Sequence, residues 1–212
     1  MFKNSKRIID TGTWAASSDL AAIDLPREGL ITEIIVRAVI TATLTATAEE
    51  DTARRVINSL QVRGDGGRTY LGLSGGDQLS RLLNYVNKCD HGAEFSSPGA
   101  ALVTIDVGST SFEQSFIFHP GSNPSDPFDL SAAIPARALS TLQLFLSTTA
   151  AAVTDAAGNI TAGTFRYTIN QVLDVPVPAG LMCPLGSLRA WANDANYADY
   201  GYPIDVPGGA WL

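Results

Sequence analysis

The sequence is poor in cysteine and in basic residues, and it has no long hydrophobic run. Its 212 residues include 2 cysteines, too few for the disulfide framework of a small secreted domain, so we expect both to be reduced. No stretch of about 18 apolar residues occurs, and the residues before Asp10 lack the apolar core of a signal peptide. We therefore expect a protein that neither spans a membrane nor is exported by a signal peptide.

Basic charge is scarce as well. The chain has 14 Lys and Arg against 21 Asp and Glu, a formal net charge of −7, whereas phosphate binding requires a basic surface. We expect no specific binding of nucleic acid. The basic residues cluster once, at Lys3, Lys6 and Arg7. This cluster is either a solvated terminus or a short arm that contacts an anionic partner or a membrane surface.

Patterns of catalytic or metal-binding residues are weak. Residues 72–76 match the G-x-S-x-G string around Ser74, but a nucleophile elbow requires a parallel sheet with an acid and a histidine downstream. Cys89, Asp90 and His91 lie together, but a structural zinc site requires four ligands at a recognised spacing, and only Cys183 is left to add. We predict no catalytic residues, no metal site and no cofactor, and therefore no enzymatic activity.

The sequence is rich in segments that alternate apolar and polar residues. In the segment that starts at Ile31, polar residues lie on one parity at Glu33, Arg37, Thr41, Thr43 and Thr45. Apolar residues fall on the other parity at Ile34, Val36, Ala38, Ile40, Ala42, Leu44 and Ala46, which predicts a long, half-buried strand. Similar segments occur at 55–63, 68–73, 101–107, 112–118, 142–147, near 160 and at 165–175. The glycines of 64–67 predict a tight hairpin turn, and only 77–86 has helical spacing. The pattern predicts an all-β antiparallel sandwich of about eight strands.

Both ends of the chain lack this period. We predict an N-terminal arm over 1–29, a sandwich over 30–176 and a C-terminal arm rich in aromatic and proline residues over 177–212. Large apolar side chains in such arms would be a liability on a free monomer, so we predict contacts between subunits. The candidate interface residues are Trp14, Trp191, Tyr197, Tyr200, Tyr202 and Trp211. The alternative, in which the C-terminal segment folds back over its own sandwich, stays open.

The order of these features resembles the capsid proteins of tailless icosahedral viruses of bacteria and archaea, in the vertical jelly-roll lineage. The residues that carry the resemblance are 57–66 (INSLQVRGDG), 79–86, 127–136 (PFDLSAAIPA) and 140–144 (STLQL). The likeness extends over about residues 30–175. It implies a single eight-stranded jelly-roll sandwich, with one short helix and extended arms, that stands upright in a capsid. The best-known members fuse two jelly rolls, and this chain has room for one.

The resemblance also implies a function and partners. We expect a structural protein made in the host cytoplasm that assembles with copies of itself and with other capsid proteins into an icosahedral virion. The N-terminal arm is a candidate for contact with an internal viral membrane. The competing interpretation is a carbohydrate-binding or receptor-binding sandwich, because exposed aromatic side chains such as Trp191 can stack on sugar rings.

Overall fold

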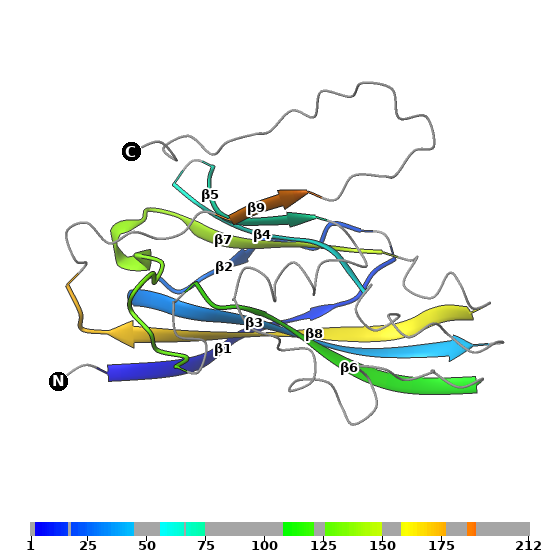
Figure 1. Cartoon of the computed structure of the whole chain (residues 1–212). Coiled ribbons are helices and arrows are strands. Elements are labelled where there is room, and N and C mark those ends of the chain that lie inside the picture. Colours follow the sequence, from blue (N-terminus) through cyan, green and yellow to red (C-terminus); the bar gives the residue numbers. More distant parts are fainter. Residues whose placement is uncertain are drawn as a thin grey trace, which may run out of the picture.

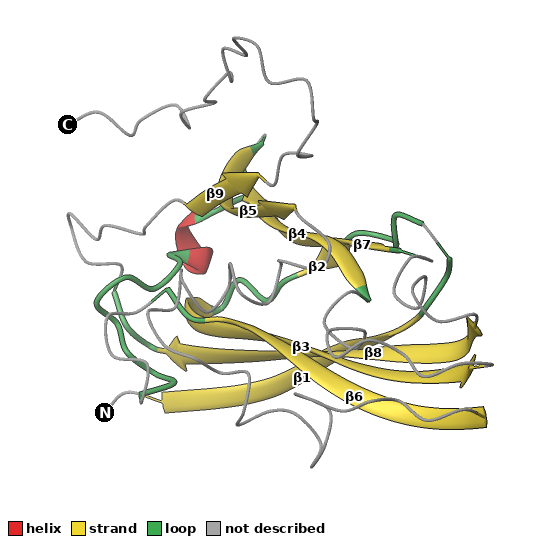
Figure 2. Cartoon of the chain, turned by 45° about the vertical axis from the view of Figure 1, so that its right-hand side comes forward, coloured by secondary structure: helices red, strands yellow, loops and turns green. Residues whose placement is uncertain are grey.

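Two β-sheets lie face to face with an apolar core between them (Figure 1). The structure is a computed structural model that describes residues 3–16, 18–44, 56–65, 67–74, 108–120, 126–149, 158–176 and 186–189. Within these residues, no helix is long and apolar enough to cross a membrane. The helical element they contain is the 3-10 turn η3, Ala136–Ala138, drawn in red in Figure 2.

The first sheet contains the long strands. Its members are β1 (Lys3–Thr13), β3 (Gly29–Leu44), β6 (Gly108–Phe118) and β8 (Gly158–Leu173), in the order β1-β8-β3-β6 with every neighbouring pair antiparallel. β3 and β8 have 16 residues each, or about 50 Å of extended chain. The long strand predicted after Ile31 is confirmed. The segments predicted near 160 and from 165 onward form one continuous strand, β8.

The second sheet consists of shorter strands and covers the inner face of the first (Figure 2). Its members are β2 (Ile23–Asp24), β4 (Ile57–Gly64), β5 (Arg68–Ser74), β7 (Leu142–Thr148) and β9 (Gly186–Arg189), in the order β2-β7-β4-β5-β9. All pairs are antiparallel except β5 with β9. Two facing antiparallel sheets confirm the predicted sandwich of the jelly-roll type.

The predicted hairpin turn joins β4 to β5. The Gly67 amide donates a hydrogen bond to the Gly64 carbonyl over 3.2 Å. Asp65 and Gly67 have φ angles of 38° and 116°, the positive values that such a turn requires. The turn chemistry read from the sequence is therefore confirmed at this position.

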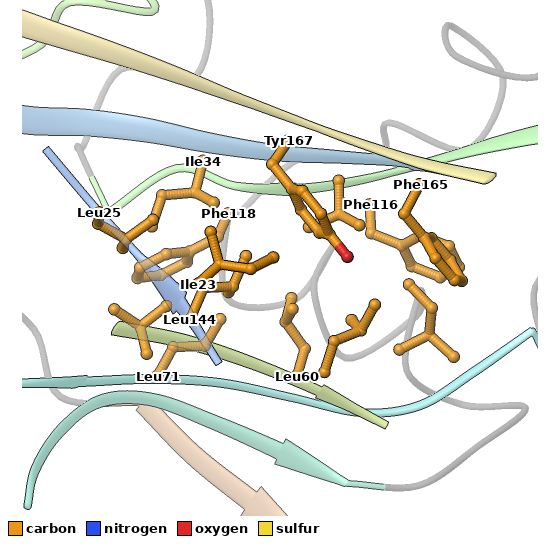
Figure 3. Packing of buried hydrophobic residues seen from close by; sticks show 14 of the residues in the cluster. Ile23, Leu25, Ile34, Leu60, Leu71, Phe116, Phe118, Leu144, Phe165 and Tyr167 are labelled. Atoms are coloured by element: carbon orange, nitrogen blue, oxygen red, sulfur yellow. The ribbon is translucent and has the colours of Figure 1, made fainter. Parts of the chain in front are cut away.

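The core consists of the inward side chains of both sheets (Figure 3). Apolar residues of the alternating segments are buried at Ile34, Val36, Ile40, Leu142, Leu144, Leu146, Phe165, Tyr167 and Ile169. Pairing explains the match: Val36 lies opposite Phe116 on one neighbouring strand and opposite Tyr167 on the other. Directly opposed residues point to the same side of a sheet, so alternation in three strands combines into one apolar face.

Residues 126–139 cover one end of the first sheet. Ile134 exchanges two backbone hydrogen bonds with Ile31, of 2.9 and 2.7 Å, next to the position where the pairing of β3 with β6 ends. Leu30 and Val172 are buried there in a second apolar cluster with Ala133, Val175, Phe128 and Leu130. Leu30 adjoins Ile31 of the main core, so this cluster lies on the outer side of the sheet. This loop thus contacts its own sandwich.

The prediction that residues 1–29 supply no sheet strand is wrong. β1 pairs with β8 from Lys3 opposite Leu173 to Thr13 opposite Thr164. Its period is hidden because the register shifts between Ile8 and Asp10, and such a bulge reverses the parity of the side chains that follow. Contact of this segment with neighbouring subunits stays a prediction. The predicted helix at 77–86, the predicted strand at 101–107 and most of the C-terminal arm lie outside the described residues.

Candidate assembly surfaces

Of the six candidate interface residues, Trp14 lies within the described part of the chain. Its side chain is half-buried and packs against the main core, and its amide donates to the Gly163 carbonyl over 3.0 Å. A Cβ on Gly163 would lie 2.7 Å from Trp14 Cβ, so the tryptophan rests directly on β8. Trp14 is thus fixed to its own sandwich, and its role in an interface stays a prediction. The other five residues lie outside the described part.

A groove of about 780 Å³ opens at the end of the sandwich that carries η3. It lies between β1, the segment that joins β2 to β3, and the residues that lead into β7. We call it the arginine groove, because three of its charged side chains are arginines. Its lining consists of Arg7, Asp24, Leu25, Pro26, Arg27, Glu28, Arg137, Leu139, Ser140, Thr141 and Leu142.

The two acidic residues of the groove already have partners. Glu28 forms an ion pair with Arg7, with 3.3 Å between Oε1 and Nη1. Asp24 Oδ1 accepts a hydrogen bond of 2.9 Å from the Gln143 amide group. Arg27 donates to two backbone carbonyls, those of Leu139 and Ser140, and so holds the strand entry of β7 in place. No carboxylate of the described residues lies within salt-bridge distance of Arg27 or Arg137.

Asp65 fixes the β4–β5 turn against the floor of this groove. Its Oδ1 accepts hydrogen bonds from the Ser140 amide at 2.6 Å, the Ser140 hydroxyl at 2.7 Å and the Thr141 amide at 3.1 Å. The Ser140 hydroxyl, then the two amides, lower the pKa of the carboxyl below its ordinary value, and the charge of Arg27 adds to the effect. The carboxylate form thus holds the turn and the groove wall together.

Each sheet has two edge strands, and the outer side of each edge strand is not paired with another strand of the described residues. In the first sheet these are β1 and β6, and β1 carries Lys3, Lys6 and Arg7. Charged residues on an edge strand oppose uncontrolled pairing with other chains. The basic cluster of the sequence is therefore part of a sheet edge, and Arg7 reaches the arginine groove.

Beyond the part covered by residues 126–139, the outer faces of the sheets carry polar side chains. On the first sheet, Arg37 pairs with Glu113, and the hydroxyls of Thr41 and Ser111 lie 2.9 Å apart. On the second sheet the Arg63 guanidinium lies over the Phe145 ring, 5.1 Å from its centroid. Among the described residues, Val39, with 40% of its surface accessible, is the large apolar side chain that stays exposed. These faces offer hydrogen bonds and ion pairs to a neighbour.

The residues weighed for chemistry do not form a described site. Ser74 lies at the end of β5, which pairs antiparallel with β4 and parallel with the four residues of β9. The residues that follow it, where an elbow would require a helix, lie outside the described residues. Cys89, His91 and Cys183 lie outside the described residues. Within the described ranges no three His, Cys, Asp or Glu side chains lie close enough together to hold a metal ion.

The arginine groove was missed at the level of sequence. Arg7 belongs to the basic cluster, but Arg27 and Arg137 are isolated in irregular segments, and their spacing of 110 positions carries no local signal.

No family model and no curated protein matches the chain. Solved structures do match. The major capsid protein of Sulfolobus Turreted Icosahedral Virus matches with a TM-score of 0.58 and 18% identity, over 81% of this chain and 48% of that chain. A second structure, of the Sulfolobus Turreted Icosahedral Virus itself, matches with a TM-score of 0.56 and 19% identity, over 80% and 45%.

A third match is PBCV-1 VP54, from a structure fitted into a reconstruction of the virophage Sputnik. It has a TM-score of 0.54 and 14% identity, over 82% of this chain and 42% of that chain. The predicted resemblance to jelly rolls of icosahedral-virus capsids is thus confirmed at the level of the fold. The chain spans about half the length of each of these proteins.

Proposed function

We propose that this chain is a structural protein of a viral capsid, which assembles with copies of itself or with other capsid proteins into the capsomers of an icosahedral virion. The observation that carries the proposal is the shared fold: about four-fifths of the chain superimposes on capsid proteins of icosahedral viruses. Identity of 14–19% is low, so conserved site residues contribute nothing to the proposal. The proposed role is structural and not catalytic.

The length of the chain suggests what its partners are. It covers 48% of the archaeal-virus capsid protein and 42% of VP54, so it supplies about half of such a subunit. A second sandwich is then needed to build an equivalent unit. Either another copy of this chain or a related jelly-roll protein would supply it.

The dimensions and surfaces are compatible with upright packing. Strands of 16 residues give the sandwich a length of about 50 Å, enough to cross a protein shell. The long outer faces carry paired charges and hydroxyls, such as Arg37 with Glu113, which suit contacts that must form reversibly during assembly. Edge strands β1 and β6 would lie beside neighbouring sandwiches.

Two finer parts of the proposal concern the N-terminus and the alternatives. Contact with an internal membrane would involve the β1 end of the sheet, where Lys3, Lys6 and Arg7 occur. Nucleic acid is not among the proposed partners because of the net charge of −7. No observation on the described residues favours the carbohydrate-binding alternative, which depends on aromatic residues outside them.

The test is assembly of the purified full-length chain, followed by sedimentation velocity and negative-stain electron microscopy over a range of concentrations. The expected result is rings or shells, formed alone or with a jelly-roll protein encoded beside it. Leu144→Ala serves as the control, because a core truncation lowers stability without altering the surface. A monomer at every concentration, with every such partner, contradicts the proposal; specific binding on a glycan array would support the alternative instead.

A further inference from the structure

The arginine groove contains two guanidinium groups, those of Arg27 and Arg137, that form no ion pair with a carboxylate of the described residues, although the charge of Asp65 lies near Arg27. Glu28 is paired with Arg7, and Asp24 is held by Gln143. Arg27 uses donors on backbone carbonyls, which carry no net charge, and Arg137 is exposed at η3 with no carboxylate partner among the described residues. A guanidinium has five N–H donors, so both side chains keep donors directed to an outside acceptor.

The C-terminal segment, residues 190–212, has the complementary chemistry. It carries Asp194, Asp199 and Asp205 and contains no Lys, Arg or His. Its aromatic residues are Trp191, Tyr197, Tyr200, Tyr202 and Trp211. Arginine pairs with carboxylates in a bidentate manner and also stacks on aromatic rings, so one side chain can engage both kinds of residue.

The position of β9 bears on which copy supplies the segment. β9 is at the opposite edge of its sheet from β2, four strand spacings or about 19 Å away. It runs parallel to β5, which starts beside Gly64 at the groove end and leads away from it. Arg189, at the end of β9, therefore lies at the sheet edge and at the strand end that are both remote from the groove of its own copy. Because β9 leads away from that groove, we assign the segment that follows it to the groove of a neighbouring copy.

We propose that the arginine groove is a docking site for the acidic, aromatic segment 190–212 of a neighbouring copy. The inference rests on the proposed function, since it names a contact by which copies assemble. Asp194, Asp199 and Asp205 of one copy pair with Arg27 and Arg137 of the next, and ring stacking on the guanidinium groups adds apolar contact. The contact joins different surfaces on the two copies, so it is directional and propagates around a ring.

The experiment exchanges charges in the full-length chain. The groove variant carries Arg27→Glu and Arg137→Glu, and the tail variant carries Asp194→Lys, Asp199→Lys and Asp205→Lys. A matched control, Arg68→Glu with Arg166→Glu, reverses two exposed charges outside the groove and gives the same net charge, −7 − 4 = −11, as the groove variant. Each protein is melted to confirm folding, and assembly is followed by light scattering and sedimentation. Arg137→Glu alone repeats the test without disturbing the carbonyl contacts of Arg27.

We expect the groove and tail variants each to need at least about tenfold more protein to assemble, about 1.4 kcal/mol of lost contact. The control should stay within about threefold of wild type. An equimolar mixture of the groove and tail variants should recover assembly, because each then offers the charge the other lacks. Raising the salt concentration should weaken wild type more than the groove variant.

Several results would overturn the inference. If the groove variant assembles at the same protein concentration as wild type, the groove is not a docking site, and the proposed capsid role is unaffected. If assembly recovers in a chain that carries both the groove and the tail substitutions, but not in the mixture of the two variants, the contact lies within one copy. A third result would assign the groove to a membrane. In it, wild type binds anionic vesicles, the groove variant does not, and the tail variant assembles as wild type does. If wild type never assembles, the capsid role fails, and native mass spectrometry of mixed variants still decides whether this pairing occurs.

Discussion

Truncation of Leu144 to alanine tests the parity of the core directly. Leu144 is fully buried at the centre of β7, where it lies between Ile23 of β2 and Val62 of β4. All three side chains belong to the same apolar cluster, in which Figure 3 labels Ile23 and Leu144. The strands around the truncated site therefore cannot collapse into the space without disturbing each other. Leu→Ala changes at such positions cost about 2–5 kcal/mol, and we expect about 3 kcal/mol here. For a chain of this size, that lowers the melting temperature by about 6–12 °C.

Urea unfolding followed by circular dichroism, with a parallel thermal melt, measures this loss. The control is Gln143→Ala in the adjacent position of the same strand. Gln143 faces outward and donates one hydrogen bond to Asp24, so its truncation should cost less than about 1 kcal/mol. The reasoning is refuted if Leu144→Ala loses less than about 1 kcal/mol, or if the two variants lose equal amounts. Either result would mean that β7 presents the other face to the core.

Three further changes follow from the structure. Deleting residues 1–13 should lower the melting temperature of the monomer, because β1 pairs with β8 along its length; an unchanged melt would return this segment to the status of an arm. Gly163→Ala should destabilise the chain by about 1–3 kcal/mol and alter tryptophan fluorescence, because the new Cβ would lie 2.6 Å from Ile40 Cδ1 and 2.7 Å from Trp14 Cβ; equal stability by urea titration would contradict the close packing. The carboxyl of Asp65 has a lowered pKa in the folded chain, so its contribution is present above the unfolded pKa of about 4 and is lost as the pH falls through the folded value; urea midpoints from pH 7 to pH 2 should fall more for wild type than for Asp65→Asn, and parallel curves would refute the role of the charge.

Local pattern alone was enough to predict the sandwich. Over 35–43 of β3 and 163–167 of β8, buried positions alternate with partly or fully exposed ones, and a period of two residues records that difference, as at Val36 and Arg37. The turn at Asp65 and Gly67 was also predictable, because positive φ angles restrict which residues fit. Both signals depend on neighbours along the chain, so a sequence contains them.

The sequence could not show β1 as a strand. Its bulge between Ile8 and Asp10 reverses the parity halfway, so neither half is long enough to reveal an alternation, and its pairing partner β8 lies about 150 residues further on. The packing of Trp14 could not be predicted either, because it also depends on pairing between segments that are distant in the sequence. Its packing against Gly163 requires the register of β1 on β8, which no local pattern encodes.

The arginine groove is the clearest case of a feature that only the tertiary structure decided. Arg7 lies on an edge strand, Arg27 on a connection and Arg137 on a 3-10 turn, and none of these segments has a period that fixes where a side chain points. They meet because β1 pairs with β8, and because Ile134 pairs with Ile31 and brings the loop before β7 to the start of β3. Sequence determined the charges and the apolar faces, since these are properties of single residues and of local alternation. The three arginines come together in one groove only through pairing between distant segments. The free energy of that pairing depends on contacts throughout the fold and cannot be assigned to a single residue.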